Sequence, residues 1–109
     1  MANTWVTDLT HFLDETGGFP PDIPGPALRL GEYLASIVAA ATTGVPPGGQ
    51  KIPIRCRRRP GRRRCPGIVS YRILSDTRVN WACPHCGDNG FIANWQGTAW
   101  DRNPRPQVH

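Results

Sequence analysis

Four cysteines lie within 31 residues of this 109-residue chain, and their spacing restricts its fold more than any other feature. They follow the order Cys56-x8-Cys65-x17-Cys83-x2-Cys86. Two close pairs separated by roughly fifteen to twenty residues are the layout of a four-thiolate zinc site, because each pair closes a tight loop and a hairpin in the spacer brings both loops together. Such a site is tetrahedral and has no open position for a substrate. We therefore predict one structural Zn²⁺ ion bound by Cys56, Cys65, Cys83 and Cys86.

The second pair fits this layout better than the first. In "CPHCG" two residues separate the ligands, and Gly87 permits the left-handed turn that such a loop commonly needs. In "CRRRPGRRRC" eight residues separate them, where about two to four are usual. The longer loop is compatible with the site if it is a hairpin that turns at Pro60-Gly61 and places Cys56 opposite Cys65 across two strands.

The sequence Cys83-Pro84-His85-Cys86 is also a familiar active-site sequence of thiol-disulfide oxidoreductases, which gives a weaker hypothesis. In those enzymes the pair begins a helix, whose N-terminus lowers the pKa of the first cysteine. Here "GDNG" follows Cys86 and starts no helix, and too little chain remains for the βαβ framework. The spacing also leaves open an iron site with four thiolates, disulfides or unbound thiols, and a site in which His85 replaces one thiolate.

The positive charge is concentrated in the second half of the chain. Residues 1–50 contain one basic and five acidic residues, a net charge of −4, whereas residues 51–109 contain twelve basic and three acidic residues, a net charge of +9. This asymmetry indicates that the second half meets a polyanion or an acidic protein partner. Six of the basic residues lie between the first two cysteines: Arg57, Arg58, Arg59, Arg62, Arg63 and Arg64.

These six arginines predict phosphate contacts, because guanidinium groups bind phosphate oxygens bidentately. A solvated, solubilising loop is the plainer interpretation of a run of charges. This run, however, has a single sign and lies on a loop held at both ends by metal ligands, so we expect DNA or RNA binding. The aromatic rings near the second pair can stack on bases, but packing into a small core is favoured for them; they are Trp81, Phe91, Trp95 and Trp100.

The pattern of apolar residues predicts an α+β fold, with an N-terminal helical segment followed by a small antiparallel β module. In residues 1–49, near-helical spacing predicts a short helix over 4–15 and a longer one over 26–43, with Pro/Gly-rich linkers after each. In residues 50–102, short alternating runs flank the cysteines and predict the strands. Residues 103–109 are expected to form a flexible tail.

The stretch from about Ile52 to Asp101 resembles zinc-ribbon modules in its ligand plan. The segments "PGPALRLGEYLASIVAAAT", "IRCRRRPGRRRC" and "WACPHCGDNGFIANWQGTAWD" look like a group of small bacterial proteins without an established activity. This resemblance implies a zinc-ribbon-like module over 50–102 and zinc binding in the cytoplasm, carried onto Cys56, Cys65, Cys83 and Cys86.

No secretory signal or membrane span is visible, because charged residues interrupt the N-terminus and the longest apolar stretch, residues 37–41, is too short. We expect a cytoplasmic protein that is not an enzyme and has no small-molecule substrate, since no catalytic constellation is present. The main hypothesis is a structural zinc protein that binds nucleic acid through an arginine-rich hairpin. The second hypothesis is a zinc-stabilised protein-interaction module, and the weakest is an oxidoreductase that uses Cys83 and Cys86.

Overall fold

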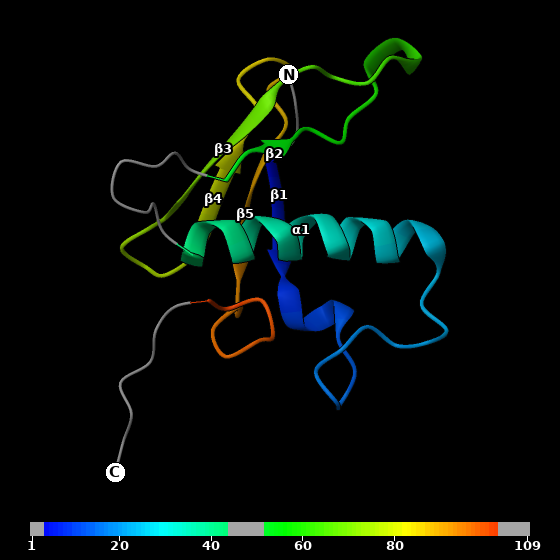
Figure 1. Ribbon diagram of the computed structural model, residues 1–109, viewed down its shortest axis with the longest axis vertical. Helices are drawn as coiled ribbons and strands as arrows, with labels where there is room; N and C mark the ends of the chain where they lie inside the picture. The colour runs from blue at the N-terminus through cyan, green and yellow to red at the C-terminus, as the bar shows by residue number, and fades with distance from the viewer. Residues whose placement is uncertain (1–3, 44–51, 103–109) are drawn as a thin grey trace.

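The computed structural model of the chain describes residues 4–43 and 52–102. In chain order its elements are β1 (Thr4–Asp8), the 3₁₀ helix η1 (Leu9–Phe12), α1 (Gly25–Thr43), β2 (Ile54–Arg55), the 3₁₀ turn η2 (Pro60–Arg62), β3 (Ile68–Ile73), β4 (Val79–Ala82) and β5 (Asn89–Ala93). The five strands form one sheet, and Figure 1 shows α1 crossing in front of them. The predicted α+β class is confirmed.

The sheet is mixed, not antiparallel as predicted. Its strand order is β1-β5-β4-β3-β2. The strands β2 to β5 pair in antiparallel fashion and come from the part of the chain where the β module was predicted. At the other edge, β1 pairs with β5 in parallel, with Trp5 beside Gly90 and Thr7 beside Ile92. The N-terminus therefore supplies the strand that makes the sheet mixed.

The helix predicted over residues 4–15 is wrong. Residues 4–8 form a strand and residues 9–12 a single 3₁₀ turn. The run Thr-Trp-Val-Thr at 4–7 is β-branched or aromatic throughout, and such residues favour strands when a partner strand is available. Asp8 then caps the turn, because its carboxylate accepts the backbone N–H of Thr10 at 2.9 Å. As a result α1 is not N-terminal to the sheet.

The helix predicted over residues 26–43 is confirmed as α1. Its buried stripe includes Leu34 and Val38, which are at most 1% exposed. At Gly31 the helix approaches the N-terminal segment closely, since a Cβ atom added there would lie 2.7 Å from the ring of Phe19. One side of α1 therefore packs on the sheet, and the helix also packs on the segment that precedes it.

The two faces of the sheet differ in burial. Toward α1, alternate residues of β3, β4 and β5 form the core: Val69, Tyr71, Val79, Trp81 and Ile92. Packing is confirmed for Trp81 and Trp95, each 3% exposed, while Phe91 and Trp100 are half-buried. The opposite face carries more exposed side chains, among them Ile68 at 49% and Val6 at 74%.

Two segments for which the sequence makes predictions lie outside the described residues. They are the Pro/Gly-rich linker at 44–49 and the tail at 103–109. Within residues 4–43 and 52–102, no helix combines the length and the hydropathy that a membrane crossing requires.

Candidate metal centre

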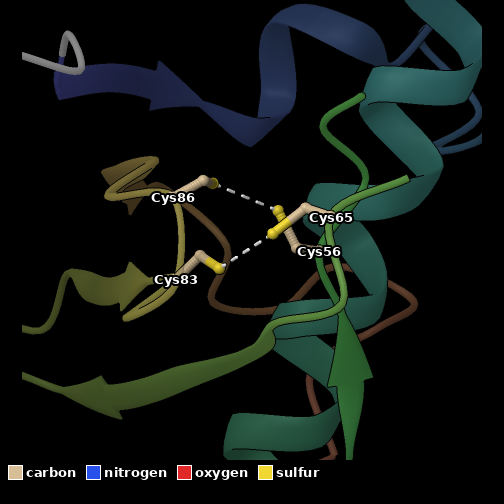
Figure 2. Close-up of side chains that lie close together, drawn as sticks. All are labelled: Cys56, Cys65, Cys83 and Cys86. Carbon is tan, nitrogen blue, oxygen red and sulfur yellow. Dashed lines mark hydrogen bonds between the residues drawn. The ribbon is translucent and has the colours of Figure 1, made fainter. Parts of the chain in front are cut away.

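The four predicted ligands meet at one point. Cys56 follows β2, Cys65 follows the arginine-rich segment, Cys83 follows β4, and Cys86 lies in the connection to β5. Figure 2 shows their sulfur atoms pointing toward one another. The Sγ atoms of Cys56 and Cys86 are 3.6 Å apart, and those of Cys65 and Cys83 are 3.7 Å apart. All four sulfur atoms lie within 4.8 Å of one another, so the structure assembles the whole predicted ligand set.

The cluster suits a tetrahedrally coordinated metal ion. A zinc–sulfur bond of about 2.3 Å gives a tetrahedron with sulfur–sulfur edges of about 3.8 Å, close to the two measured distances. All four cysteines are free thiols, and three of them are at most 1% exposed, with Cys86 half-buried. His85 is exposed and is not part of the cluster. Four soft, largely buried donors fit a structural site for a thiophilic metal.

The second pair closes a tight loop by itself. The backbone N–H of Gly87 donates to the carbonyl of Cys83 at 2.9 Å, and the N–H of Cys83 donates to the carbonyl of Asp88 at 2.7 Å. Gly87 has a φ of 83°, the left-handed conformation predicted for it. β5 begins directly afterwards, at Asn89, so no helix follows Cys86. The helix N-terminus that activates an oxidoreductase cysteine is therefore missing at this position.

The first pair closes with the same bond despite its longer spacing. The N–H of Cys56 donates to the carbonyl of Gly67 at 3.0 Å, and in both pairs the acceptor lies two residues after the second cysteine. The N–H of Cys65 donates to the carbonyl of Arg58 at 2.8 Å. The two ends of the segment 59–64 therefore lie close together, because the residues that flank it, Arg58 and Cys65, are hydrogen-bonded to each other. The eight-residue spacing is therefore equivalent to a two-residue loop that carries a six-residue insertion.

This insertion, residues 59–64, turns at the position that the sequence predicted. η2 covers Pro60–Arg62, and the N–H of Arg62 donates to the carbonyl of Arg59 at 3.1 Å. Gly61 and Arg62 both have left-handed backbones, with φ of 63° and 67°. The segments on either side of the turn are not strands. The loop does join the antiparallel strands β2 and β3, as a hairpin requires. The two cysteines lie outside these strands, however, and Cys56 bonds to Gly67 instead of lying opposite Cys65, so that part of the prediction is wrong.

The six arginines of the loop are all exposed. Arg57 lies against helix α1, with its guanidinium carbon 5.8 Å from the centre of the Tyr33 ring. Nη2 of Arg59 donates to the backbone carbonyl of Arg62 at 3.4 Å. Within residues 4–43 and 52–102, neither ion pair includes a loop arginine. Figure 1 shows η2 projecting away from α1 and from the sheet.

Gly67 is a site residue that the sequence reasoning missed. Its N–H donates to the Sγ of Cys65 at 3.4 Å. A Cβ atom added at this position would lie 2.3 Å from the Sγ of Cys83 and 2.9 Å from the Cβ of His85. Only glycine therefore lets the two loops approach each other closely. The signal that could have found it is the sequence "CPG" at 65–67, which places a glycine beside the first pair much as "CPHCG" does beside the second.

Burial raises the pKa values of the thiols, whereas hydrogen bonds from backbone N–H groups lower them. Burial raises the pKa of Cys56 to about 12 and also raises the pKa of Cys65. Burial opposes ionisation of Cys83 too, but the backbone N–H groups of Cys86 and His85 outweigh it and lower the pKa of Cys83. Without a metal ion, Cys56 and Cys65 are therefore protonated at neutral pH, so metal binding at these two ligands has to release protons.

Helix α1 borders the centre through Tyr33. Its ring packs edge-on against Trp81, with ring centres 5.8 Å apart. The pKa of Tyr33 is raised first by burial and then by the negative potential of Cys56, Asp88 and Cys83. The Tyr33 hydroxyl and the Trp81 indole N–H are buried without a hydrogen-bond partner among the described residues. The cysteine cluster and the helix therefore share one packed region, and a change in either is expected to affect the other.

Comparison of the chain with protein-family models, with curated proteins and with solved structures finds no match. The zinc-ribbon-like module over residues 50–102 therefore stays a prediction. The close approach of its four sulfur atoms makes the cysteine cluster compatible with structural metal binding.

Proposed function

We propose that the protein binds one structural Zn²⁺ ion and uses the arginine-rich loop between Cys56 and Cys65 to bind nucleic acid. The observation that carries this proposal is the six-residue insertion in the first metal-binding loop. The second pair reaches the cluster with only two residues between its cysteines, so metal binding does not require residues 59–64.

Zinc is proposed because of the donor set and the size of the fold. Four thiolates in a closed site are typical of structural zinc, although iron also accepts this set. Zinc binding stabilises small zinc peptides by on the order of 10–16 kcal/mol at neutral pH. The cysteines link β2, the arginine-rich loop and the β4–β5 connection, so this free energy would fix both loops against α1 and the sheet.

Nucleic acid is proposed because the loop arginines repel one another and neither ion pair of the described residues includes one of them. Six guanidinium groups in one short loop raise the local electrostatic energy, and a phosphate backbone relieves it by releasing counterions. A zinc ion with four thiolates carries two negative charges and offsets part of the repulsion. Arg57, which lies over the Tyr33 ring, would take that role, whereas the arginines of the insertion are exposed.

The test is a binding titration of the metal-loaded protein with DNA and RNA over a series of salt concentrations. If four to six phosphates are engaged, log K falls against log salt with a slope of about −3 to −5. Replacing Arg63 and Arg64 by Gln should weaken binding and make the slope less negative by about 2. The matched control replaces Arg29 and Arg102, two exposed arginines outside the loop, and should change much less.

Two results would contradict the proposal. One is an affinity that does not depend on salt. The other is equal weakening by the loop variant and by the control variant, which would show that only net charge matters. An acidic protein partner of the loop would then be the better hypothesis.

A further inference from the structure

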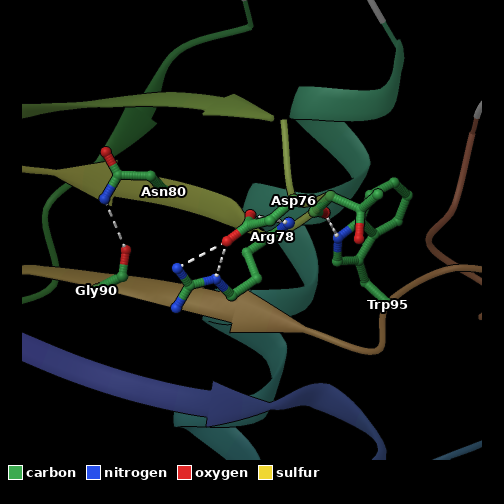
Figure 3. A network of polar contacts seen from close by, with 6 residues as sticks. Asp76, Arg78, Asn80, Gly90 and Trp95 are labelled. Atoms are coloured by element: carbon green, nitrogen blue, oxygen red, sulfur yellow. Dashed lines mark hydrogen bonds and ion pairs between the residues drawn. The ribbon is translucent and has the colours of Figure 1, made fainter. Parts of the chain in front are cut away.

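The face of the sheet that points away from α1 forms a continuous surface across four strands. In the strand register, Val6 lies beside Phe91, Phe91 beside Asn80, and Asn80 beside Arg72. These four side chains therefore form one row from β1 to β3. Figure 3 shows this face, with α1 behind the strands and the side chains of Asn80 and Arg78 in front.

Arginines connect this face to the arginine-rich loop. Arg55 is exposed on β2, directly before Cys56, and pairs in register with Ile68 of β3. Arg72 is exposed on β3, on the same face as Ile68, from which it is four residues distant. Positive charge therefore extends along a path from the arginine-rich loop across β2 and β3. It passes through Arg55 and ends at Arg72, which belongs to the same row as Phe91.

At the end of this path is an aromatic ring with a guanidinium group over it. The guanidinium carbon of Arg78 is 4.5 Å from the centre of the Phe91 ring. Nε and Nη2 of Arg78 are each 2.8 Å from Oδ2 of Asp76, which fixes the group in place. The Arg78 side chain is still 39% exposed. Nucleic-acid bases stack both on aromatic rings and on guanidinium planes, so the pair offers a stacking surface.

Polar groups lie beside this stacking surface. A shallow hollow on the sheet is lined by Ser70, Tyr71, Arg72 and Asn80. The Asn80 amide donates to the carbonyl of Gly90 at 3.1 Å, which holds its side chain against the sheet. Hydrogen-bonding groups that are fixed beside a stacking surface suit the edge of an unpaired base.

We propose that this face binds a single strand of nucleic acid that continues from the arginine-rich loop. Arg55 and Arg72 contact phosphates, and Phe91 with Arg78 stacks on a base. This inference rests on the proposed function and extends it from a charged loop to a single-stranded ligand. A duplex is excluded as the main ligand because its bases are stacked on one another and do not present their faces.

A protein partner fits this face less well. The strongly exposed apolar residues, Val6 and Ile68, lie on β1 and β3, with β5 and β4 between them. Arg72, Asn80 and Ser70 occupy much of the surface that separates them. The face therefore has no continuous apolar patch of the kind that most protein interfaces place at their centre.

The experiment compares metal-loaded wild type with Phe91→Leu and Arg72→Gln. The probes are oligo-dT and oligo-rU of 4 and 16 nucleotides and a 16-base-pair duplex. The matched controls are Ile73→Ala, which changes a 40% exposed apolar residue on the α1 side of the sheet, and Arg29→Gln on the helix. Metal content and thermal unfolding establish that each variant is folded.

We expect each of the two face variants to bind the 16-nucleotide strand about 10-fold more weakly than wild type. Arg72→Gln should also make the salt slope less negative by about 1. The face variants should bind the 4-nucleotide strand about as well as wild type does. The two control variants should bind every probe about as well as wild type does. A ratio between oligo-dT and oligo-rU far from one would show which of the two strands the site prefers and would support the proposal equally.

Three outcomes would overturn the inference. If the face variants bind the long strand like wild type while loop variants do not, the loop function stands and the face has no part in it. If the duplex binds more tightly than the single strand, a stacking surface is not used. If polyglutamate competes as well as oligo-dT against every variant, the surface recognises negative charge in a protein. Absence of any nucleic-acid binding by wild type would overturn the proposed function as well.

Discussion

The two cysteine pairs reach the same cluster by the same backbone bond but differ in what they carry. In the second pair, Cys83 bonds to the carbonyl two residues after Cys86, and two residues separate the ligands. In the first pair, Cys56 makes the equivalent bond, and a six-residue insertion rich in arginine projects from the loop. The difference shows that ligand geometry fixes the base of each loop and leaves its tip free. The tip of the first loop is therefore where a function separate from metal binding can be sought.

The largest effect is expected from loss of a ligand in either loop. Cys83→Ser and Cys65→Ser should each abolish tight metal binding and remove most of the metal-linked stability, which is on the order of 10–16 kcal/mol in small zinc peptides. Thermal unfolding and metal analysis measure this loss. We predict that the two variants lose metal affinity and stability to the same extent. Unchanged stability of either variant would mean that its loop is not part of the metal centre.

The next effect should come from Gly67→Ala. Its added Cβ would lie 2.3 Å from the Sγ of Cys83, so one of the loops has to move. Overpacking of this kind costs about 1–3 kcal/mol. Competition with a chelator should show weaker metal binding by roughly ten-fold or more. A Gly67→Ala protein with wild-type metal affinity would show that the two loops are not in close contact.

A smaller effect on metal binding is expected when alanine replaces Gly87, and none when alanine replaces Gly61, although the two glycines have similar backbone conformations. Gly87, at the base of the second loop, has φ of 83°, and Gly61, in the insertion, has φ of 63°. Alanine in a left-handed conformation costs about 1–2 kcal/mol. At Gly87 this cost should weaken metal binding, because the residue follows a ligand and bonds back to Cys83. At Gly61 metal binding should be unchanged. Equal weakening by the two alanines would contradict the division between base and tip.

The smallest effect on the metal should come from deleting residues 59–64. The deletion leaves Cys56-Arg57-Arg58 followed directly by Cys65, which is the spacing of the second pair. Since the carbonyl of Arg58 and the N–H of Cys65 are already 2.8 Å apart, the loop can rejoin with little movement. Metal affinity should stay within about three-fold of wild type, because surface changes away from packed groups usually cost at most about 0.5 kcal/mol.

The same deletion should weaken nucleic-acid binding strongly, because it removes four of the six loop arginines. A control that replaces the insertion by six Gly and Ser residues keeps the loop length and removes only the charge. If the deletion destroys metal binding, residues 59–64 are part of the metal site and the comparison between the two loops fails.

Local features of the fold and the site could be predicted from the sequence. The ligand set followed from cysteine spacing, and the alternation of Val69, Tyr71 and Ile73 identified β3. The turn at Pro60-Gly61 and the left-handed Gly87 followed from short-range backbone preferences. Each of these depends on residues that are neighbours in the chain or in one loop.

The features that were missed depend on contacts between distant segments. β1 is a strand because it pairs with β5, and Thr4 and its partner Asn89 are 85 positions apart. In isolation, residues 4–15 carry a weak helical spacing, and nothing local reveals the partner strand. The requirement for Gly67 arises from Cys83 and His85 on the other loop. The sequence also does not show that the two cysteine loops close with equivalent backbone hydrogen bonds. That similarity follows from the bonds that Cys56 and Cys65 make to the carbonyls of Gly67 and Arg58.

Native mass spectrometry of the full chain, before and after chelation, tests the central claim of a structural zinc site most directly. We predict one zinc ion per chain, with four thiols protected from alkylation, and loss of the folded charge-state distribution when zinc is removed. Elemental analysis of the same sample distinguishes zinc from iron. A protein that stays folded without any metal, with its four cysteines open to alkylation, would contradict this claim.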